Sequence, residues 1–144
     1  MALSVTISEE LILDGNDRSN THTATFTVNE LDHRVLTIDN TEKSILLFDT
    51  ANEAGTIEDG NLAYLRITNL DISDTVTLRI RDAAQEFMVR LKAGGSFILT
   101  EDKLDADEAG IEATPIVLSQ INKISAVSSD ASGSKLEVYA ASNI

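Results

Sequence analysis

The sequence predicts an all-β protein, a single antiparallel β-sandwich of jelly-roll type with at most one short helix. Apolar and polar residues alternate in many short runs, which is the period-two pattern of half-buried strands. Clusters of Gly, Asn, Asp and Ser separate these runs at short, fairly even intervals. Strand-like and helix-like stretches do not alternate, which disfavours a nucleotide-binding α/β fold.

The strongest pattern lies at residues 63–100, where four short strands are expected. Their apolar positions are Leu65 and Ile67, then Val76, Leu78 and Ile80, then Phe87, Val89 and Leu91, and lastly the run from Phe97 to Leu99. Gly94-Gly95 precedes the last strand and predicts a hairpin turn. Because no helix and no lysine follow this pair, we reject a phosphate-binding loop there.

Alternation also predicts strands in the first third of the chain. Leu3, Val5 and Ile7 form a first strand, and the chain turns at 14–17 before an exposed loop at 16–20. In the run that follows, threonines occupy one face, and we expect the other face to point into the core. That second face carries His22, Ala24, Phe26 and Val28. A polar interruption is expected at 32–34.

The remainder of the chain predicts further strands at 44–49, 123–127 and 136–140, the last with Lys135, Glu137 and Tyr139 facing outward. The acidic stretch 101–114 is either a short helix or a solvated loop. We expect one domain spanning 1–144. Residues 1–10 are expected to form an extended N-terminal arm that pairs with a neighbour through a strand edge.

Charge and cysteine content exclude several classes of function. The formal net charge is −13, so the surface repels phosphate backbones and nucleic-acid binding is not expected. The sequence contains no cysteine, which removes disulfides and cysteine-based zinc sites. No apolar stretch reaches the length of a membrane helix and no signal peptide is recognisable, so we expect no membrane association.

Two histidines are the residues that titrate near neutral pH. His22 belongs to the expected core-facing row, and His33 lies in a polar corner where we expect it to contact water. The sequence contains neither the Gly-x-Ser-x-Gly motif of serine hydrolases nor the His-Glu-x-x-His motif of metalloproteases. We therefore expect no enzymatic activity, and we assign no catalytic, cofactor-binding or metal-ligating residue.

The acidic cluster at 101–112 matches the pattern of a calcium-binding loop only in part. In the stretch 105–110, Ala109 occupies the position of the third oxygen ligand, so the match is incomplete. Aromatic residues, which line sugar-binding sites, make up 4% of the chain, with no tryptophan. A calcium-binding or carbohydrate-binding module is therefore kept as a second alternative.

Basic side chains are concentrated on and around the second of the four strands predicted in 63–100. Thr75, Thr77, Arg79 and Arg81 are expected on one strand face, with Arg66, Arg90 and Lys92 on neighbouring strands. This arrangement fits either a solvated sheet face or a contact with an acidic neighbour, including another copy of the same chain.

Three phrases resemble small virion structural proteins of tailed bacteriophages, particularly those of marine and cyanobacterial hosts. They are YLRITNLDISDTVTLRI at 64–80, FMVRLKAGGSFIL at 87–99 and ISAVSSDASGSKLEVYAAS at 124–142. The resemblance implies a small, non-enzymatic, multicopy protein assembled in the host cytoplasm and located on the virion. It favours a capsid decoration or cement protein that contacts the major capsid protein or other virion proteins as a homo-oligomer, preferably a trimer. A neck, tail or fibre component is the first alternative.

Overall fold

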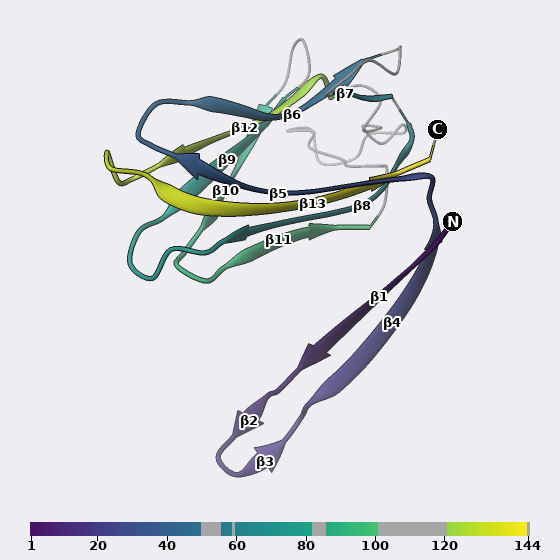
Figure 1. The fold of residues 1–144 in the computed structure, drawn as a ribbon. Coiled ribbons are helices and arrows are strands. Elements are labelled where there is room, and N and C mark those ends of the chain that lie inside the picture. Colours follow the sequence, from purple (N-terminus) through teal and green to yellow (C-terminus); the bar gives the residue numbers. More distant parts are fainter. Residues whose placement is uncertain (50–55, 59, 82–85, 101–120, 144) are drawn as a thin grey trace, which may run out of the picture.

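A computed structural model describes residues 1–49, 56–58, 60–81, 86–100 and 121–143. Two β-sheets pack face to face, and a long β-hairpin projects from one end of this sandwich (Figure 1). The described residues contain strands and turns but no helix. The predicted all-β sandwich is thus confirmed.

The order of the strands is that of a jelly roll. One sheet has the order β11, β8, β13, β5, formed by Ser96–Leu99, Leu62–Asn69, Ser134–Ser142 and Glu30–Ile38. The other has the order β10, β9, β12, β6, β7, formed by Glu86–Leu91, Val76–Arg81, Lys123–Ser128, Lys43–Asp49 and Thr56–Glu58. Neighbouring strands are antiparallel except for β6 and β7, which are parallel. With β7 left aside, consecutive strands alternate between the two sheets except for the hairpin of β9 and β10, as in the double Greek key of jelly rolls.

The core lies between the two sheets and follows the alternation in the sequence. Burial in β9 alternates residue by residue, with Val76, Leu78 and Ile80 buried and the intervening side chains half-buried. The facing sheet contributes Leu65, Ile67 and other apolar residues to the same cluster. Each fully buried leucine or isoleucine side chain contributes about 1.5–3 kcal/mol of transfer free energy.

The block at 63–100 forms the four predicted strands but divides them between the sheets. β8 and β11 pair in one sheet, while β9 and β10 pair in the other. The hairpin predicted at Gly94-Gly95 is therefore wrong, because this turn carries the chain from one sheet to the other. Alternation identifies a strand and its buried face, but the partner of a strand depends on contacts distant in sequence.

Residues 1–28 form the projecting hairpin, which we call the arm. Its long strands are β1, Ala2–Glu9, and β4, Asn20–Thr27, and near its tip β2, Ile12–Leu13, pairs with β3, Asn16–Asp17. Asp14 and Gly15 connect them with φ of 49° and 78°, the positive values that a type I′ turn requires. The N-terminal segment is thus paired within its own chain and is not a free single strand, and the loop expected at 16–20 is largely strand.

Two further expectations differ from the structure or fall outside it. Residues 32–34 do not interrupt a strand, since β5 runs continuously through them and pairs with β13 along its whole length. The helix or loop expected at 101–114, and the calcium candidate within it, lie outside the described residues.

Two aspartates at the turns of the sandwich make its stability depend on pH. Asp71 Oδ1 accepts the backbone N–H groups of Asp74 and Ser73 at 3.0 and 2.9 Å, and these bonds lower the pKa of Asp71. Hydrogen bonds from the hydroxyl and backbone N–H of Ser132 lower the pKa of Asp130 in the same way. A lowered folded-state pKa means that the ionised carboxylate favours the fold.

We therefore expect both aspartates to stabilise the fold above the unfolded-state pKa of about 3.9 and to lose this effect as pH falls through their folded-state values. In the variant D71N/D130N, the difference in urea midpoint between pH 7 and pH 3 should be smaller than in the wild type. The variant E9Q/E10Q removes two exposed charges of the arm and serves as control. An unchanged pH dependence in D71N/D130N would contradict this assignment.

Candidate interaction surfaces

The arm has two chemically different faces. The register places Leu3 opposite Phe26, Val5 opposite Ala24 and Ile7 opposite His22, so one face is largely apolar up to His22 and becomes polar at the next pair, Glu9 and Asn20. The opposite face consists of hydroxyl side chains, and two of its cross-strand pairs are hydrogen-bonded, Thr6 with Thr23 at 3.1 Å and Ser8 with Thr21 at 3.2 Å. Threonine suits such a wet, pleated surface because its side chain is β-branched.

The base of the arm packs on the outer face of the four-stranded sheet. Val28, Tyr64 and Ala141 are buried there, and Leu3 and Phe26 pack against them. The rings of Phe26 and Tyr64 have their centroids 5.9 Å apart. The backbone N–H of Val28 donates to the carbonyl of Met1 at 2.8 Å and closes the two strands at this end.

Towards its tip, the arm exposes apolar side chains. Ile12 is 63% exposed and Leu13 is 72% exposed. A two-stranded ribbon without a third layer is only marginally stable in water. His22, expected to face the core, is exposed on the arm instead, because the row to which it belongs faces away from the sandwich interior. The exposed apolar residues indicate a surface that another molecule covers.

The outer face of the four-stranded sheet carries a set of ring and charge contacts across three strands. His33 of β5 stacks on Tyr139 of β13 with centroids 3.9 Å apart, and the guanidinium of Arg66 from β8 lies 4.7 Å from the same ring. Glu137 contacts both His33 Nε2 at 3.2 Å and Arg66 Nη2 at 2.7 Å. His33 was expected to contact only water, so this prediction is wrong. The four side chains thus interact as cross-strand neighbours, although Nε of Arg66 is buried without a hydrogen-bond partner among the described residues.

A groove of about 280 Å³ lies where the arm meets this face of the sheet. Residues of β1 line one side, and Leu31, Tyr64, Arg66 and Tyr139 line the other. Leu31 is 50% exposed. The groove is shallow, with one cation and two aromatic rings, and belongs to the junction of arm and sandwich.

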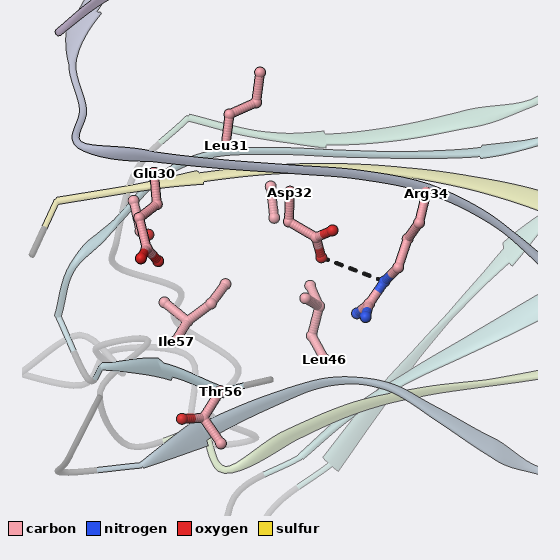
Figure 2. Close-up of a pocket in the computed structure, with 9 residues that line it drawn as sticks. Glu30, Leu31, Asp32, Arg34, Leu46, Thr56 and Ile57 are labelled. Atoms are coloured by element: carbon pink, nitrogen blue, oxygen red, sulfur yellow. Dashed lines mark ion pairs between the residues drawn. The ribbon is translucent and has the colours of Figure 1, made fainter. Parts of the chain in front are cut away.

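A second groove, of about 390 Å³, opens between the edge strands of the two sheets (Figure 2). Arg34 points into it from β5, with its Nε atom 3.3 Å from Asp32 Oδ2, and its Nη2 donates to the carbonyl of Ile45 on the opposite sheet. Leu46 and Ile57 form the apolar wall. Since Arg34 is bonded to both sheets, its role here is to close the open side of the sandwich, and inward charges of this kind also protect edge strands from pairing.

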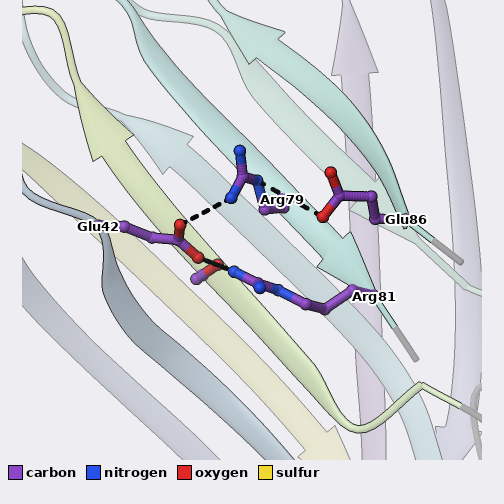
Figure 3. A network of polar contacts seen from close by, with 5 residues as sticks. Glu42, Arg79, Arg81 and Glu86 are labelled. Atoms are coloured by element: carbon purple, nitrogen blue, oxygen red, sulfur yellow. Dashed lines mark hydrogen bonds and ion pairs between the residues drawn. The ribbon is translucent and has the colours of Figure 1, made fainter. Parts of the chain in front are cut away.

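The outer face of the five-stranded sheet is rich in cations. Arg79 and Arg81 both contact the carboxylate of Glu42, Arg79 at 2.9 Å, and Arg79 Nε lies 3.8 Å from Glu86 (Figure 3). The register adds two cations on the same face, because Arg90 is opposite Thr77 and Lys123 is opposite Arg81. We call the four residues Arg79, Arg81, Arg90 and Lys123 the basic patch. Two exposed apolar residues, Met88 (54%) and Leu47 (42%), lie on this face beside them.

The structure brings together part of the basic block expected from the sequence. Thr77, Arg79 and Arg81 lie on one face of β9 and Arg90 joins them, as expected. Arg66 lies on the other sheet, Thr75 precedes β9 and Lys92 follows β10. Neither residue parity nor strand order within the block could reveal that β8 and β9 belong to different sheets.

The hairpin character of the arm was missed although the sequence contains a signal for it. All the pairs of the arm, from Ala2 with Thr27 to Leu13 with Asn16, are placed symmetrically about Asp14-Gly15. An Asp-Gly pair flanked by two alternating runs is a strong hairpin signal. Reading that symmetry would have predicted both the turn and the register.

In the parts of the chain that the structure describes, no group of three or more His, Asp or Glu residues is placed to hold a metal ion. Within the same residues, no helix is long and apolar enough to cross a membrane. Comparison of the chain with family models, curated proteins and solved structures gives no match.

Proposed function

We propose that this protein is a non-enzymatic structural component of a tailed-phage virion, in the first place a capsid decoration or cement protein. The observation that carries the proposal is the arm, a hairpin that leaves the sandwich with an apolar face and an exposed tip. Such an element gains stability when a neighbouring molecule covers it, as expected of a protein that is held in a lattice.

Three further observations support this proposal. The jelly-roll strand order is used by many viral structural proteins, although a fold alone does not assign a function. The resemblance of 64–80, 87–99 and 124–142 to virion proteins covers β8 to β11 and the closing strands. In the described residues, the side chains around Tyr139 contact one another across three strands, which fits a structural sheet face.

In this role the arm is the part that neighbours hold. The partners are the major capsid protein or other virion proteins, and further copies of the chain. Assembly takes place in the host cytoplasm, and several copies acting together convert weak single contacts into stable attachment. A neck, tail or fibre component would use the same surfaces at lower copy number.

Shortening the arm is expected to reduce attachment to the particle at least about tenfold while leaving the sandwich folded. The variant replaces residues 8–21 with Asn-Gly, which joins the paired positions Ile7 and His22 by a type I′ turn. The base of the arm, with Leu3 and Phe26, stays intact. Thermal melting checks the fold, and quantitative mass spectrometry of purified particles measures bound protein relative to the major capsid protein.

The same measurement separates the two virion roles. A decoration protein should be present in roughly hundreds of copies and a neck or tail component in about a dozen or fewer, following the symmetry of its attachment site. Absence of the wild-type protein from purified particles would overturn the proposal. Equal occupancy of the wild type and the shortened variant would exclude the arm as the attachment element.

A further inference from the structure

We propose that the neighbour held by the arm is a second copy of this chain, and that the arm lies across the basic patch on the five-stranded sheet of that copy. The inference deepens the proposed function, on which it rests only for the premise that the arm is covered by a neighbour. It commits to one occupant and to one surface, and both are defined by described residues.

The first argument is charge complementarity. The arm carries Glu9, Glu10, Asp14 and Asp17 near its tip against one cation, Arg18. Of the eleven basic residues of the chain, the other ten follow residue 30. Hydrogen bonds from the side chain and backbone of Ser19 lower the pKa of Asp17, which keeps this carboxylate ionised in mildly acidic solution. An acidic tip of this kind requires a cationic surface for docking.

The basic patch provides such a surface on a molecule that is otherwise strongly acidic. Among the described residues of this sheet face, Glu42 and Glu86 neutralise part of the charge through Arg79 and Arg81. Arg90 and Lys123 bring the patch itself to four cations against these two glutamates, while Asp49 and Glu58 lie further along the same face on β6 and β7. Met88 and Leu47 expose apolar surface beside these cations, where the apolar side chains of the arm can pack.

The second argument is geometric and excludes contact within one molecule. The base of the arm is fixed to the outer face of the four-stranded sheet through Tyr64 and Ala141. In Figure 1 the arm extends away from the sandwich on that side, while β9, β10 and β12 form the opposite side. The two complementary surfaces of one molecule therefore face in opposite directions. They can meet only between copies, and each copy presents one surface of each kind.

The third argument is the size of the contact. From Ala2 to Leu13 the arm spans roughly 40 Å at about 3.3 Å per residue, and a two-stranded ribbon is about 10 Å wide, so one face covers roughly 400 Å². In a closed ring each copy contributes one arm and receives another. Each arm–sheet contact thereby buries roughly 800 Å² in total over its two partners, which is the size of a weak interface, so association depends on each copy taking part in two such contacts. A head-to-tail contact of this kind closes into a ring when its rotation allows.

The test uses the purified full-length chain without particles, with mass measured by light scattering and sedimentation over a range of concentrations. The wild type is expected to associate. Its association should weaken as salt rises from about 0.05 to about 0.5 M, because this increase shortens the electrostatic screening length roughly threefold. The arm variant E9K/E10K and the sheet variant R90E/K123E should each associate at least about tenfold more weakly than the wild type. These variants leave Arg79, Arg81 and Glu42 in place, so the fold is preserved.

Exchanging the charges of the two surfaces is the decisive part of the experiment. The chain carrying all four substitutions should regain association, because its lysine-bearing arm meets a glutamate-bearing sheet. A mixture of the arm variant and the sheet variant should form a one-to-one pair, since each retains one intact surface. The variant E30K/K135E, changed on β5 and β13 away from both surfaces, is the matched control and should associate as the wild type does.

A second variant tests the apolar part of the contact without changing charge. I12N/L13N alters side chains that are largely exposed in the single chain, so its melting midpoint should stay close to that of the wild type while association weakens about tenfold. The inference would be overturned if the wild type stayed monomeric at all concentrations. It would also be overturned if the chain with all four charge substitutions associated no more strongly than E9K/E10K or R90E/K123E.

These outcomes are separate from those of the proposed function. A chain that is monomeric in solution yet present on particles refutes the self-association and leaves the virion role standing. A chain that associates through these surfaces but is absent from particles refutes the virion role alone.

Discussion

Replacing Asn69 with leucine is expected to lower the free energy of unfolding by about 2–4 kcal/mol, because it removes a buried polar group that joins two turns. Asn69 ends β8 and is fully buried. Its Nδ2 donates to the carbonyls of Asp74 at 2.7 Å and Lys92 at 3.2 Å, and its Oδ1 accepts the backbone N–H of Asp71 at 3.1 Å.

The main chain of Asn69 completes this junction. Its backbone N–H donates to the carbonyl of Gly95 at 2.9 Å, and its carbonyl accepts the N–H of Gly94 at 3.0 Å. The residue thus holds together the turn after β8 and the turn by which the chain crosses between the sheets. Leucine has nearly the same volume but leaves these carbonyls and one N–H without the side-chain partners that they have in the wild type, and each orphaned buried group costs about 1–3 kcal/mol.

Urea denaturation followed by circular dichroism measures the loss for N69L. A matched control is N40A, since Asn40 is exposed in a surface turn and should change stability by about 0.5 kcal/mol or less. N69D should also destabilise, because a carboxylate cannot donate to the two carbonyls and brings a buried charge. A loss below about 0.5 kcal/mol in N69L would show that the junction is held by the main chain alone.

Replacing Gly133 with alanine is expected to cost about 2–4 kcal/mol, through two effects that can be separated. Gly133 lies in the turn between β12 and β13 with φ of 98°, a conformation that side chains with a Cβ rarely adopt. A Cβ at this position would also lie 2.7 Å from Cγ2 of Thr37 on the neighbouring strand β5. The backbone strain alone accounts for about 1–2 kcal/mol.

A double-mutant cycle with T37S isolates the steric effect. Serine lacks the methyl group that meets the new Cβ. It keeps the hydroxyl that, in Thr37, accepts a hydrogen bond from the ammonium group of Lys135 at 2.8 Å. In the T37S background, G133A should therefore cost about 1 kcal/mol less than in the wild type. Gly60 is the control, since its φ is 81° but a Cβ there meets nothing within 4 Å, so G60A should show the strain alone. Equal costs for G133A and G60A would argue against the clash.

The sequence predicted individual strands better than their partners. The alternation in 63–100 located β8 to β11, and the outward positions Lys135, Glu137 and Tyr139 were confirmed on β13. The assignment of these strands to two sheets was not predictable, because the turn at Gly94-Gly95 could equally well form a hairpin or a crossing. The bonds of Asn69 that select the crossing join residues more than twenty positions apart.

The candidate surfaces were likewise predictable only within single strands and not across strands. The sequence showed that the apolar residues of the arm share one face of a strand. Alternation alone does not distinguish a face that packs on the core from a face on a projecting hairpin. Arg79, Arg81 and Arg90 could be grouped from their spacing, whereas the contact of Glu42 with Arg79 and Arg81 joins β9 to a residue 37 and 39 positions earlier. Cross-strand neighbours such as His33, Tyr139 and Arg66 come from three separate parts of the chain.

The sequence by itself determined the fold class, most strand positions and the buried faces of the strands of the sandwich, because a two-residue period follows directly from the geometry of the extended backbone. It also determined the net charge of the molecule. Only the tertiary structure decided that the first 28 residues project as a hairpin, and that the acidic tip and the basic patch face in opposite directions. Pairing and packing are set by contacts between distant residues, which no local pattern of side chains specifies.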